Sequence, residues 1–568
     1  MIKRWSVPLG LAALVLVLGF PALSRYGVTW DEALGDFFFG ERYLDYFLSF
    51  DQRYLDFAAD PYPPEHRPDL SGSPFRNRPW EYYPVANVLA AATSRLLASR
   101  LGWLDPFDGF HAVNLFLGAA LIASLYVYVR RRFDAIAALT AAVLLFTSPR
   151  IVADLLSNLK DTPEMAFFAL TLLAFAAAFE RGSAPGVIAS GLLWGLALGT
   201  KANALFLPAI VLITVVVSAR PAPWRGRTTA LWASLAAFVI VGLATAFAWW
   251  PYLWGAPVER AREHLQYVGL RIFSTRPESV ISPLQAIVYT TPLPFLGLSA
   301  AGAAIAAREL ASRARQPRFA LPLAWTAVVL TRLHLPGAVN FDGVRHFLEL
   351  FPALAILGGI SASRLARWVL GEAADGEPVA DGAAIPPPAR SSAVRRGAAA
   401  ALLALLLLPS VAAVARVHPF ELAYWNAIAG GLDGARAKRL AQAGDYWVTS
   451  YRTGLEWVNA NAERDAALAV PLAQHTVEIA APVRLRPDVV LLDLVRPTSV
   501  EPRPEWRGML AHLAQEMPVY VMFALRDDWT NELMRDCLTR LRPIQQWTVD
   551  GEPVLVIYRW TPALHSGG

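Results

Sequence analysis

The chain has 568 residues, of which 55% are hydrophobic and 17% charged, and its mean hydropathy is +0.37. A soluble protein of this size carries about a quarter charged residues, so the composition excludes an ordinary soluble enzyme and indicates a membrane protein. The net charge of +5 comes from arginines scattered between apolar runs, which excludes a typical nucleic-acid-binding protein, and the single cysteine, Cys537, excludes an internal disulfide and a cysteine-based metal site.

The first apolar stretch, residues 5–23, follows a basic start and fits either a membrane span or a cleaved signal peptide. Both interpretations place residues 24–108, the first outer loop, outside the cytoplasm. This loop is too long and too aromatic to be a simple connector. Residues 84–101 within it could cross the membrane, but we expect an amphipathic helix on the outer face, with Arg95 and Arg100 toward the lipid headgroups.

Arginines in the loops predict the orientation of the spans. If residues 84–101 stay outside and the N-terminus inside, every loop arginine cluster falls inside; if they cross, every cluster falls outside. We therefore expect a multi-pass protein of the inner (plasma) membrane of a bacterium, with a cytoplasmic N-terminus and an extracytoplasmic C-terminus. About eleven spans are predicted, near residues 5–23, 109–129, 134–149, 163–180, 185–201, 203–219, 228–250, 282–307, 319–335, 344–362 and 397–416.

Two domains follow from this pattern. Residues 1–416 are predicted to form the membrane domain, which contains a flexible cytoplasmic linker at residues 371–394. Residues 417–568 are predicted to form an extracytoplasmic α/β domain, with a role in acceptor recognition or stability. Its short apolar runs alternate with helix-like stretches and are typical of buried strands; they are "AALAVPLA", "PDVVLLDL", "PVYVMFAL" and "EPVLVIYRW".

Ionisable residues recur in short motifs near the predicted outer ends of spans. In chain order these are "TWDEALG" with Asp31 and Glu32, "LLSNLKDTPEMAFFAL" with Asp161, "GLALGTKANALFLP" with Lys201, and "VRHFLELFPALAIL" with Arg345 and His346. A fifth motif, "HPFELAYWNAIAGG", follows the last span.

In order and sidedness, over about residues 5–430, these motifs resemble the GT-C glycosyltransferases. The resemblance is to the group, similar to glycosyltransferase family 39, that includes protein O-mannosyltransferases and the aminoarabinose transferase acting on lipid A. It implies a polytopic α-helical GT-C fold and an inverting transfer of a sugar from a polyprenyl-phosphate donor. Where the family commonly has His-Pro-Pro before its surface helix, this chain has "WEYYP", residues 80–84, and His346 stands where tyrosine is usual.

Such a transfer needs a base near the acceptor oxygen and cations near the departing phosphate. We expect Asp31 to be the base and Glu32 to orient the acceptor or tune Asp31. The other assignments are donor-phosphate binding by Lys201, Arg345 and His346, and a second acid or acceptor contact by Asp161 and Glu81.

Simpler interpretations of these residues stay open. The Asp31–Glu32 pair and Asp161 could cap the helices that follow them. Lys201 and Arg345 could snorkel at span ends.

Metal dependence and function also leave alternatives. His334 and His346 with Asp342 could hold a metal, and some GT-C enzymes use a divalent ion, so a requirement for Mg or Mn stays open. The alternative function is a membrane transporter or flippase, but transporters place ionisable residues at the midplane of broken helices. The expected partners are the lipid bilayer, the polyprenyl-phosphate-sugar donor, and a protein, lipid or glycan acceptor; the sequence does not identify the sugar.

Overall fold

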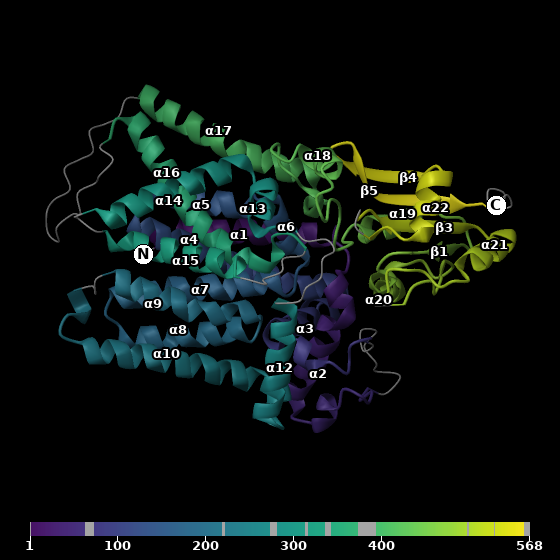
Figure 1. Ribbon diagram of the computed structural model, residues 1–568, viewed down its shortest axis with the longest axis horizontal. Helices are drawn as coiled ribbons and strands as arrows, with labels where there is room; N and C mark the ends of the chain where they lie inside the picture. Colours follow the sequence, from purple (N-terminus) through teal and green to yellow (C-terminus); the bar gives the residue numbers. More distant parts are fainter. Residues whose placement is uncertain are drawn as a thin grey trace.

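The computed structural model describes residues 2–62, 73–218, 222–272, 281–312, 316–335, 342–372, 393–496, 499–526 and 529–561. Figure 1 shows a bundle of long helices and, beyond one end of the bundle, a small sheet with its own helices. Most of the predicted linker, residues 373–392, lies outside the described residues. The division of the chain at residues 416 and 417 stays a prediction.

Seven helices among the described residues are long and apolar enough to cross a membrane. They are α1 (Ile2–Leu23), α4 (Pro106–Arg132), α7 (Asp161–Glu180), α10 (Thr228–Trp249), α14 (Leu293–Ala311), α16 (Phe351–Leu370) with the preceding turn η9 (Arg345–Leu350), and α17 (Ala393–Val417). An eighth span would combine α5 (Ala135–Phe146) and α6 (Pro149–Ser157), which meet at a bend of 67°.

Shorter helices occupy the other predicted spans. They are α8 (Ala184–Leu198), α9 (Leu207–Val217) with η6 (Ala202–Phe206), and α15 (Ala320–Leu333). Each of the eleven predicted spans therefore coincides with a helix. The chain is a multi-pass helical membrane protein, as its hydropathy predicts.

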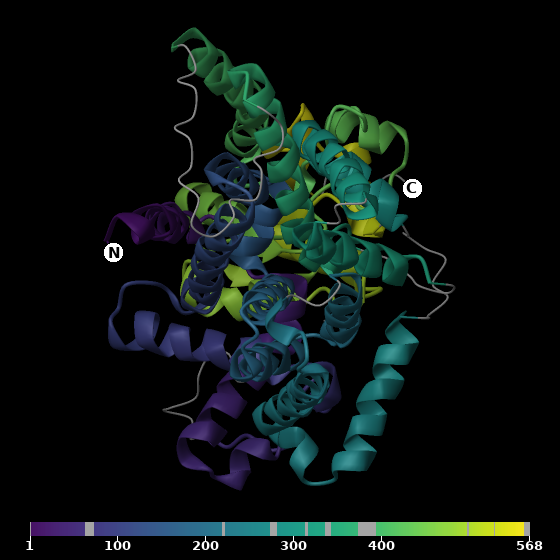
Figure 2. The same ribbon diagram turned by 90° about the vertical axis from the view of Figure 1, so that its left-hand side faces the viewer.

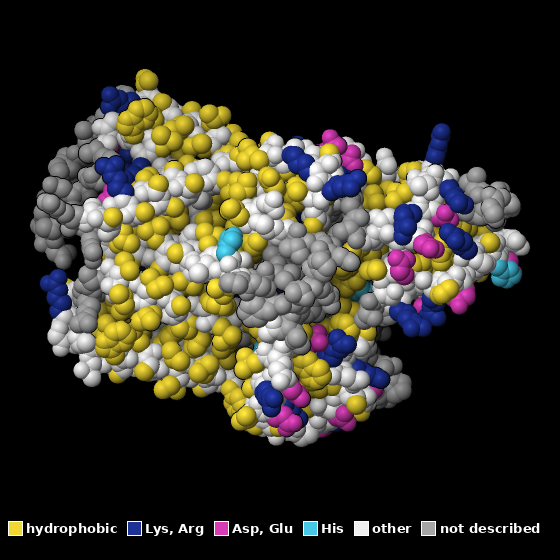
Figure 3. Space-filling model, in the orientation of Figure 1, with side chains coloured by type: hydrophobic (Ala, Val, Ile, Leu, Met, Phe, Trp, Pro, Cys, Tyr) yellow, Lys and Arg dark blue, Asp and Glu magenta, His cyan; other side chains and the backbone are white. Residues whose placement is uncertain are grey.

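The surface of the bundle fits a lipid environment. Figure 3 shows apolar side chains over the helical part with few charges, lysines and arginines at its left edge, and mixed charges over the sheet and its helices at the right. A bilayer requires such an apolar band around the spans. Figure 2, turned so that the left side faces the viewer, shows α12 (Pro257–Ile272) running across the spans.

Burial separates central from peripheral helices. The apolar window of α7 is 83% buried and that of η9 with α16 is 89% buried, whereas those of α1 and α17 are only 17% buried. The most buried spans thus carry Asp161 and Arg345 at their first residues.

The segment predicted as a surface helix differs in part from expectation. It forms α3 (Pro84–Ser94) and a π-helical turn, η5 (Arg95–Arg100), and α3 packs against α2 (Phe37–Ser49) and α4. The expectation that Arg95 points toward headgroups is wrong, because its guanidinium pairs with Glu41 and Asp45 of α2. Arg100 is exposed.

The C-terminal region contains a five-stranded sheet of order β2-β1-β3-β5-β4. β1 pairs in parallel with β2 and β3, and β5 pairs antiparallel with β3 and β4. The strands are β1 (Ala467–Ala469), β2 (Val490–Leu491), β3 (Val519–Ala524), β4 (Gln545–Val549) and β5 (Glu552–Trp560), and the helices are α18 (Gly431–Ala437), α19 (Tyr451–Asn461), α20 (Gln474–Arg484), α21 (Trp506–Glu516) and α22 (Glu532–Arg540).

All four apolar runs are strands, which confirms the predicted α/β character of this region. β4 was not predicted because its side chains alternate between partly buried and exposed, so it carries no apolar run. It joins β5 through Asp550 and Gly551, both at positive φ, as a tight hairpin turn requires.

Candidate active site

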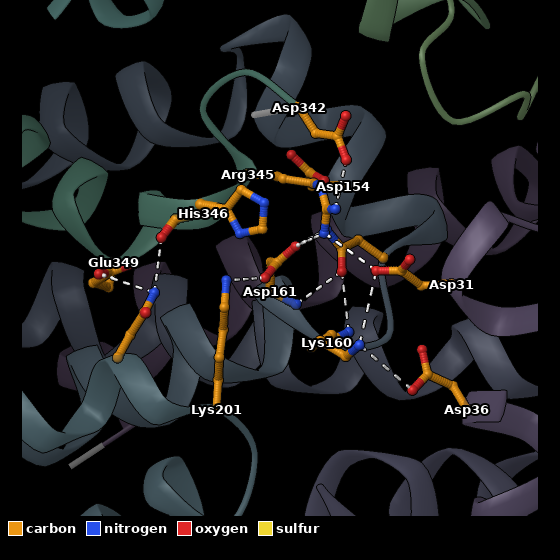
Figure 4. Close-up of polar contacts among 12 residues, drawn as sticks. Asp31, Asp36, Asp154, Lys160, Asp161, Lys201, Asp342, Arg345, His346 and Glu349 are labelled. Atoms are coloured by element: carbon orange, nitrogen blue, oxygen red, sulfur yellow. Dashed lines mark hydrogen bonds and ion pairs between the residues drawn. The ribbon is translucent and has the colours of Figure 1, made fainter. Parts of the chain in front are cut away.

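Charged side chains from the ends of four helical segments meet in one place, as Figure 4 shows. Figure 1 shows these helix ends on the side of the bundle nearest the C-terminal region. We call these side chains the charged cluster: Asp31, Lys160, Asp161, Lys201 and Arg345. Asp31 follows α1, Lys160 directly precedes α7 and Asp161 begins it, Lys201 lies between α8 and η6, and Arg345 begins η9. Four of the five are residues that the sequence motifs predicted.

Asn158 shapes the start of α7. Its Oδ1 accepts hydrogen bonds from the backbone N–H groups of Lys160, at 3.0 Å, and Asp161, at 2.8 Å. Its Nδ2 donates to Asp154 at 2.7 Å and to Asp161 Oδ2 at 2.8 Å. One amide side chain therefore binds two backbone N–H groups just before and at the start of α7 and also holds the Asp161 carboxylate.

Arg345 is the centre of the cluster and its side chain is buried. Its Nη1 lies 3.3 Å from Oδ2 of both Asp31 and Asp161, and its Nη2 lies 2.6 Å from Asp342 Oδ2. The guanidinium also stacks over the ring of Trp447, with 4.4 Å to the centroid. A planar fork with five donors can serve several oxygens in this way, which a lysine could not.

Two lysines complete the cluster. Lys201 Nζ donates to Asp161 Oδ1. Lys160 Nζ lies 3.8 Å from Asp31 and 3.9 Å from Asp36, over the face of Tyr82. Each carboxylate of this group thus has at least one cation beside it, as buried charges require.

Exposure distinguishes Asp31 from the other acids. Its side chain is 29% exposed, whereas those of Asp161 and Asp36 are 1% and 2% exposed. Lys160 is 20% exposed and Lys201 12%. The face of the cluster that a substrate can reach therefore presents one carboxylate between cations.

Burial and charge shift the pKa values of two groups that lie outside the spans. Burial raises the pKa of Asp36 to about 7, although Lys160 opposes the shift. Burial lowers the pKa of Lys160, but the carboxylates of Asp36 and Asp31 outweigh it, so the net pKa lies above its usual range. Lys160 therefore stays positively charged at neutral pH.

Two predicted site residues do not join the cluster. Glu32 is buried and turned inward, where Oε2 accepts the backbone N–H of Thr29 at 2.8 Å and Oε1 lies 3.0 Å from His111 Nε2. Glu32 therefore faces the interior, and the expectation that it orients the acceptor or tunes Asp31 stays a prediction. Glu81 pairs with Arg78 at 3.4 Å.

His346 does lie at the cluster. Figure 4 shows its ring beside Asp161, close enough for an electrostatic interaction between the two side chains. Its backbone carbonyl accepts a hydrogen bond from Asn203 at 2.8 Å. The predicted phosphate-binding set of Lys201, Arg345 and His346 is therefore brought together around one carboxylate.

The simpler interpretations fit the structure less well. Asp31 makes no side-chain capping bond, and Asp161 is the first residue of α7 rather than its cap. Lys201 and Arg345 point into the carboxylates rather than snorkelling. In the part of the chain that the structure describes, no group of three or more His, Cys, Asp or Glu side chains is placed to hold a metal ion.

Comparisons with known proteins bear on the fold. A family model described as dolichyl-phosphate-mannose-protein mannosyltransferase matches residues 106–250. The crystal structure of ArnT from Cupriavidus metallidurans bound to undecaprenyl phosphate is similar over 99% of both chains, with 16% identity and a TM-score of 0.51. The chain has the GT-C fold. The resemblance inferred from the motifs is thus confirmed, and the prediction of a membrane glycosyltransferase is supported.

Two further structures have TM-scores below 0.5. One is the Archaeoglobus fulgidus oligosaccharyltransferase in its apo form, with 12% identity, 92% of this chain and 69% of that chain covered, and a TM-score of 0.44. The other is the mycobacterial arabinofuranosyltransferase AftD, with 16% identity, 98% and 41% covered, and a TM-score of 0.42. A search of curated proteins found no match.

Sequence reasoning missed Lys160, Asp36 and Asn158 as site residues, and it considered Asp342 only as a possible metal ligand, not as the partner of Arg345. Asn158 and Lys160 lie in the motif quoted for Asp161, and the polar run before a proline-led span was the available signal. Asp36 and Asp342 lie five and three residues from predicted site residues, but no spacing rule singles them out.

Proposed function

We propose that this protein transfers a sugar from a polyprenyl-phosphate donor to an acceptor hydroxyl, with inversion at the anomeric carbon. The observation that carries the proposal is the exposed carboxylate of Asp31 between Lys160 and Arg345, at the membrane-helix ends. This reaction requires a base for the acceptor and cations for the leaving phosphate. Asp31 and the cations beside it lie within one side-chain length of each other.

In the proposed reaction Asp31 takes the proton from the acceptor hydroxyl as its oxygen attacks the anomeric carbon. The bond between that carbon and the phosphate oxygen breaks, and the electron pair leaves with the lipid phosphate. Lys160, Lys201 and Arg345 stabilise the resulting negative charge, and His346 can donate a further hydrogen bond. Lys160 is added here to the predicted phosphate-binding set because it is the most exposed of the three cations.

The proposed location is the outer face of a bacterial inner membrane. The cluster lies at the bundle end nearest the C-terminal region, while Arg130–Arg132 lie at the opposite end of α4. The positive-inside rule then places the arginines in the cytoplasm and the cluster outside. A transporter is disfavoured because the charged groups gather at helix ends rather than at the middle of spans.

Binding of a lipid phosphate tests the proposal. Undecaprenyl phosphate, which ArnT binds, is the probe, titrated against purified protein in detergent. Arg345→Lys keeps the charge that balances three carboxylates but loses the fork, so it should weaken binding about tenfold or more. Arg364→Lys is the matched control, since Arg364 lies near the other end of α16 and pairs with Glu309.

The wild type and Arg364→Lys should bind the probe equally, and the wild type should release polyprenyl phosphate when it is given a sugar-loaded donor and membrane extract as acceptor. A wild-type protein that binds no lipid phosphate, or Arg345→Lys that binds as tightly as the wild type, would contradict the proposal.

A further inference from the structure

Arg526 connects the C-terminal region to the charged cluster. It follows strand β3, and its side chain is 5% exposed. Its Nη2 lies 3.1 Å from Asp342 Oδ1, while the other oxygen of the same carboxylate lies 2.6 Å from Arg345 Nη2. Asp342 therefore bridges two buried arginines and links Arg526 to Arg345.

Arg526 is itself held from two further sides. Its Nη1 donates to the backbone carbonyl of Tyr446 at 2.9 Å, and its guanidinium stacks on Trp529, with 3.8 Å to the ring centroid. Gly444 pairs with Arg526 across an isolated bridge, and a Cβ at Gly444 would lie 2.0 Å from the Leu525 carbonyl oxygen. Only glycine permits this approach, which sets the segment before Tyr446 against the end of β3.

The same two segments touch the cluster at other points. Trp447, next to Tyr446, lies under the guanidinium of Arg345 at 4.4 Å. Trp529 packs edge-on against Trp30 at 4.8 Å, and Trp30 directly precedes Asp31. Side chains of the C-terminal region therefore contact the surroundings of both groups that the reaction needs.

We propose that Arg526 is a positioning residue of the active site: acting through Asp342, it holds Arg345 where the donor phosphate binds. The proposal rests on the proposed function and extends it to the role of the C-terminal region. Without Arg526, Asp342 would lose its second cation and its anchor. It would then neutralise Arg345 more completely and leave its guanidinium less fixed, and both effects weaken a phosphate contact.

A matched control exists at the same boundary. Arg484 of α20 is equally buried, at 3% exposed, and also comes from the C-terminal region. It pairs with Asp105 and Asp108 at the start of α4, at 2.8 Å each, but has no contact with the cluster among the described residues. A residue that merely tethers the two regions should behave like Arg484.

The experiment compares Arg526→Gln with Arg484→Gln in the full chain, by thermal unfolding and by affinity for undecaprenyl phosphate. Both variants should unfold at lower temperature. Only Arg526→Gln should raise the Kd for the probe, by about tenfold, which is about 1.4 kcal/mol. In an Asp342→Asn background the same Arg526→Gln change should alter the Kd by at most about twofold, because its effect passes through Asp342.

The outcomes separate the two proposals. A wild type that does not bind the probe refutes the proposed function. A wild type that binds, with Arg526→Gln and Arg484→Gln equal in affinity, refutes the positioning role. So does an equal effect of Arg526→Gln with and without Asp342. If either glutamine variant fails to fold, Arg526→Lys against Arg484→Lys decides, because lysine keeps the charge but not the fork, and only Arg526→Lys should then raise the Kd.

Discussion

Replacement of Asp31 by asparagine is the most direct test of the proposed mechanism. Asparagine keeps the size of aspartate and most of its hydrogen bonding, but it cannot take a proton from a hydroxyl. The Asp31 carboxylate lies 3.3 Å from Arg345 and 3.8 Å from Lys160, and its side chain is partly exposed. Both cations keep another carboxylate in the variant, so no buried charge is left alone.

The expected magnitudes differ strongly between folding and catalysis. Arg345 is buried, but it keeps Asp161 and Asp342, so the free energy of unfolding should fall by less than about 3–5 kcal/mol, the cost of breaking an isolated buried pair. A positioned base contributes about 10²–10⁴-fold in rate, which corresponds to about 2.7–5.4 kcal/mol of transition-state stabilisation. Affinity for the donor phosphate should stay the same or increase, because a carboxylate that competes with phosphate for Arg345 is removed.

The assay measures three quantities on the same purified protein: the unfolding temperature, the Kd for undecaprenyl phosphate and the rate of sugar transfer from a polyprenyl-phosphate donor. Asp31→Glu is the matched variant, which keeps a proton acceptor on a longer side chain and should keep part of the rate. Near-normal transfer by Asp31→Asn, with donor binding intact, would show that Asp31 is not the base.

Four further outcomes are expected. Lys160→Gln should raise the Kd for undecaprenyl phosphate about tenfold in titrations, because the most exposed cation of the cluster is lost. Glu32→Ala should lower the free energy of unfolding by about 1–3 kcal/mol, measured with denaturant, but leave the rate of the folded fraction unchanged, since its carboxylate is hydrogen-bonded in the interior. Burial raises the pKa of Asp36 to about 7, so the folded state binds more protons than the unfolded chain between about pH 4 and 7. The free energy of unfolding should therefore fall as the pH rises through that window. In thermal melts, Asp36→Asn should make this fall smaller. A membrane-impermeant maleimide added to intact cells should label Ile428→Cys but not Arg131→Cys, and the buried Cys537 should stay unlabelled. The reverse pattern would contradict the predicted orientation of the protein in the membrane.

Hydropathy predicted the membrane helices well because burial in lipid acts on each segment separately. A run of apolar residues must form a helix in a bilayer whatever its neighbours are, so every predicted span coincides with a helix. The bend between α5 and α6 and the break before α14 were not predicted. Pro149 is the first residue of α6 and Pro292 is the N-cap of α14, and a proline disfavours helical backbone angles in the residue before it; a hydropathy average over a segment does not register this effect.

The candidate site was predictable only in part, because its contacts are long-range. Arg345 and Asp31 are 314 residues apart in sequence, and their meeting follows from the resemblance to a known family rather than from local rules. Lys160 meets Asp31 by the same kind of long-range contact; it lies within the motif quoted for Asp161, but nothing in that motif assigned it a role. Buried carboxylates need cations beside them. The predicted site residues included too few cations for their carboxylates, and this shortfall could have pointed to a further cation such as Lys160.

The Asp31–Glu32 pair shows why adjacency in sequence misleads. Asp31 and Glu32 stand at the start of the turn η1 (Glu32–Asp36), where neighbouring side chains point in different directions, so adjacent carboxylates need not face the same substrate. The π-helical turn η1 begins at Glu32, so Asp31 faces Lys160 and Arg345 while Glu32 faces His111 inside the bundle. Asp31 is therefore the carboxylate that a substrate can reach, and Glu32 is the one that holds the turn. This difference follows from helical geometry once the first residue of the turn is known.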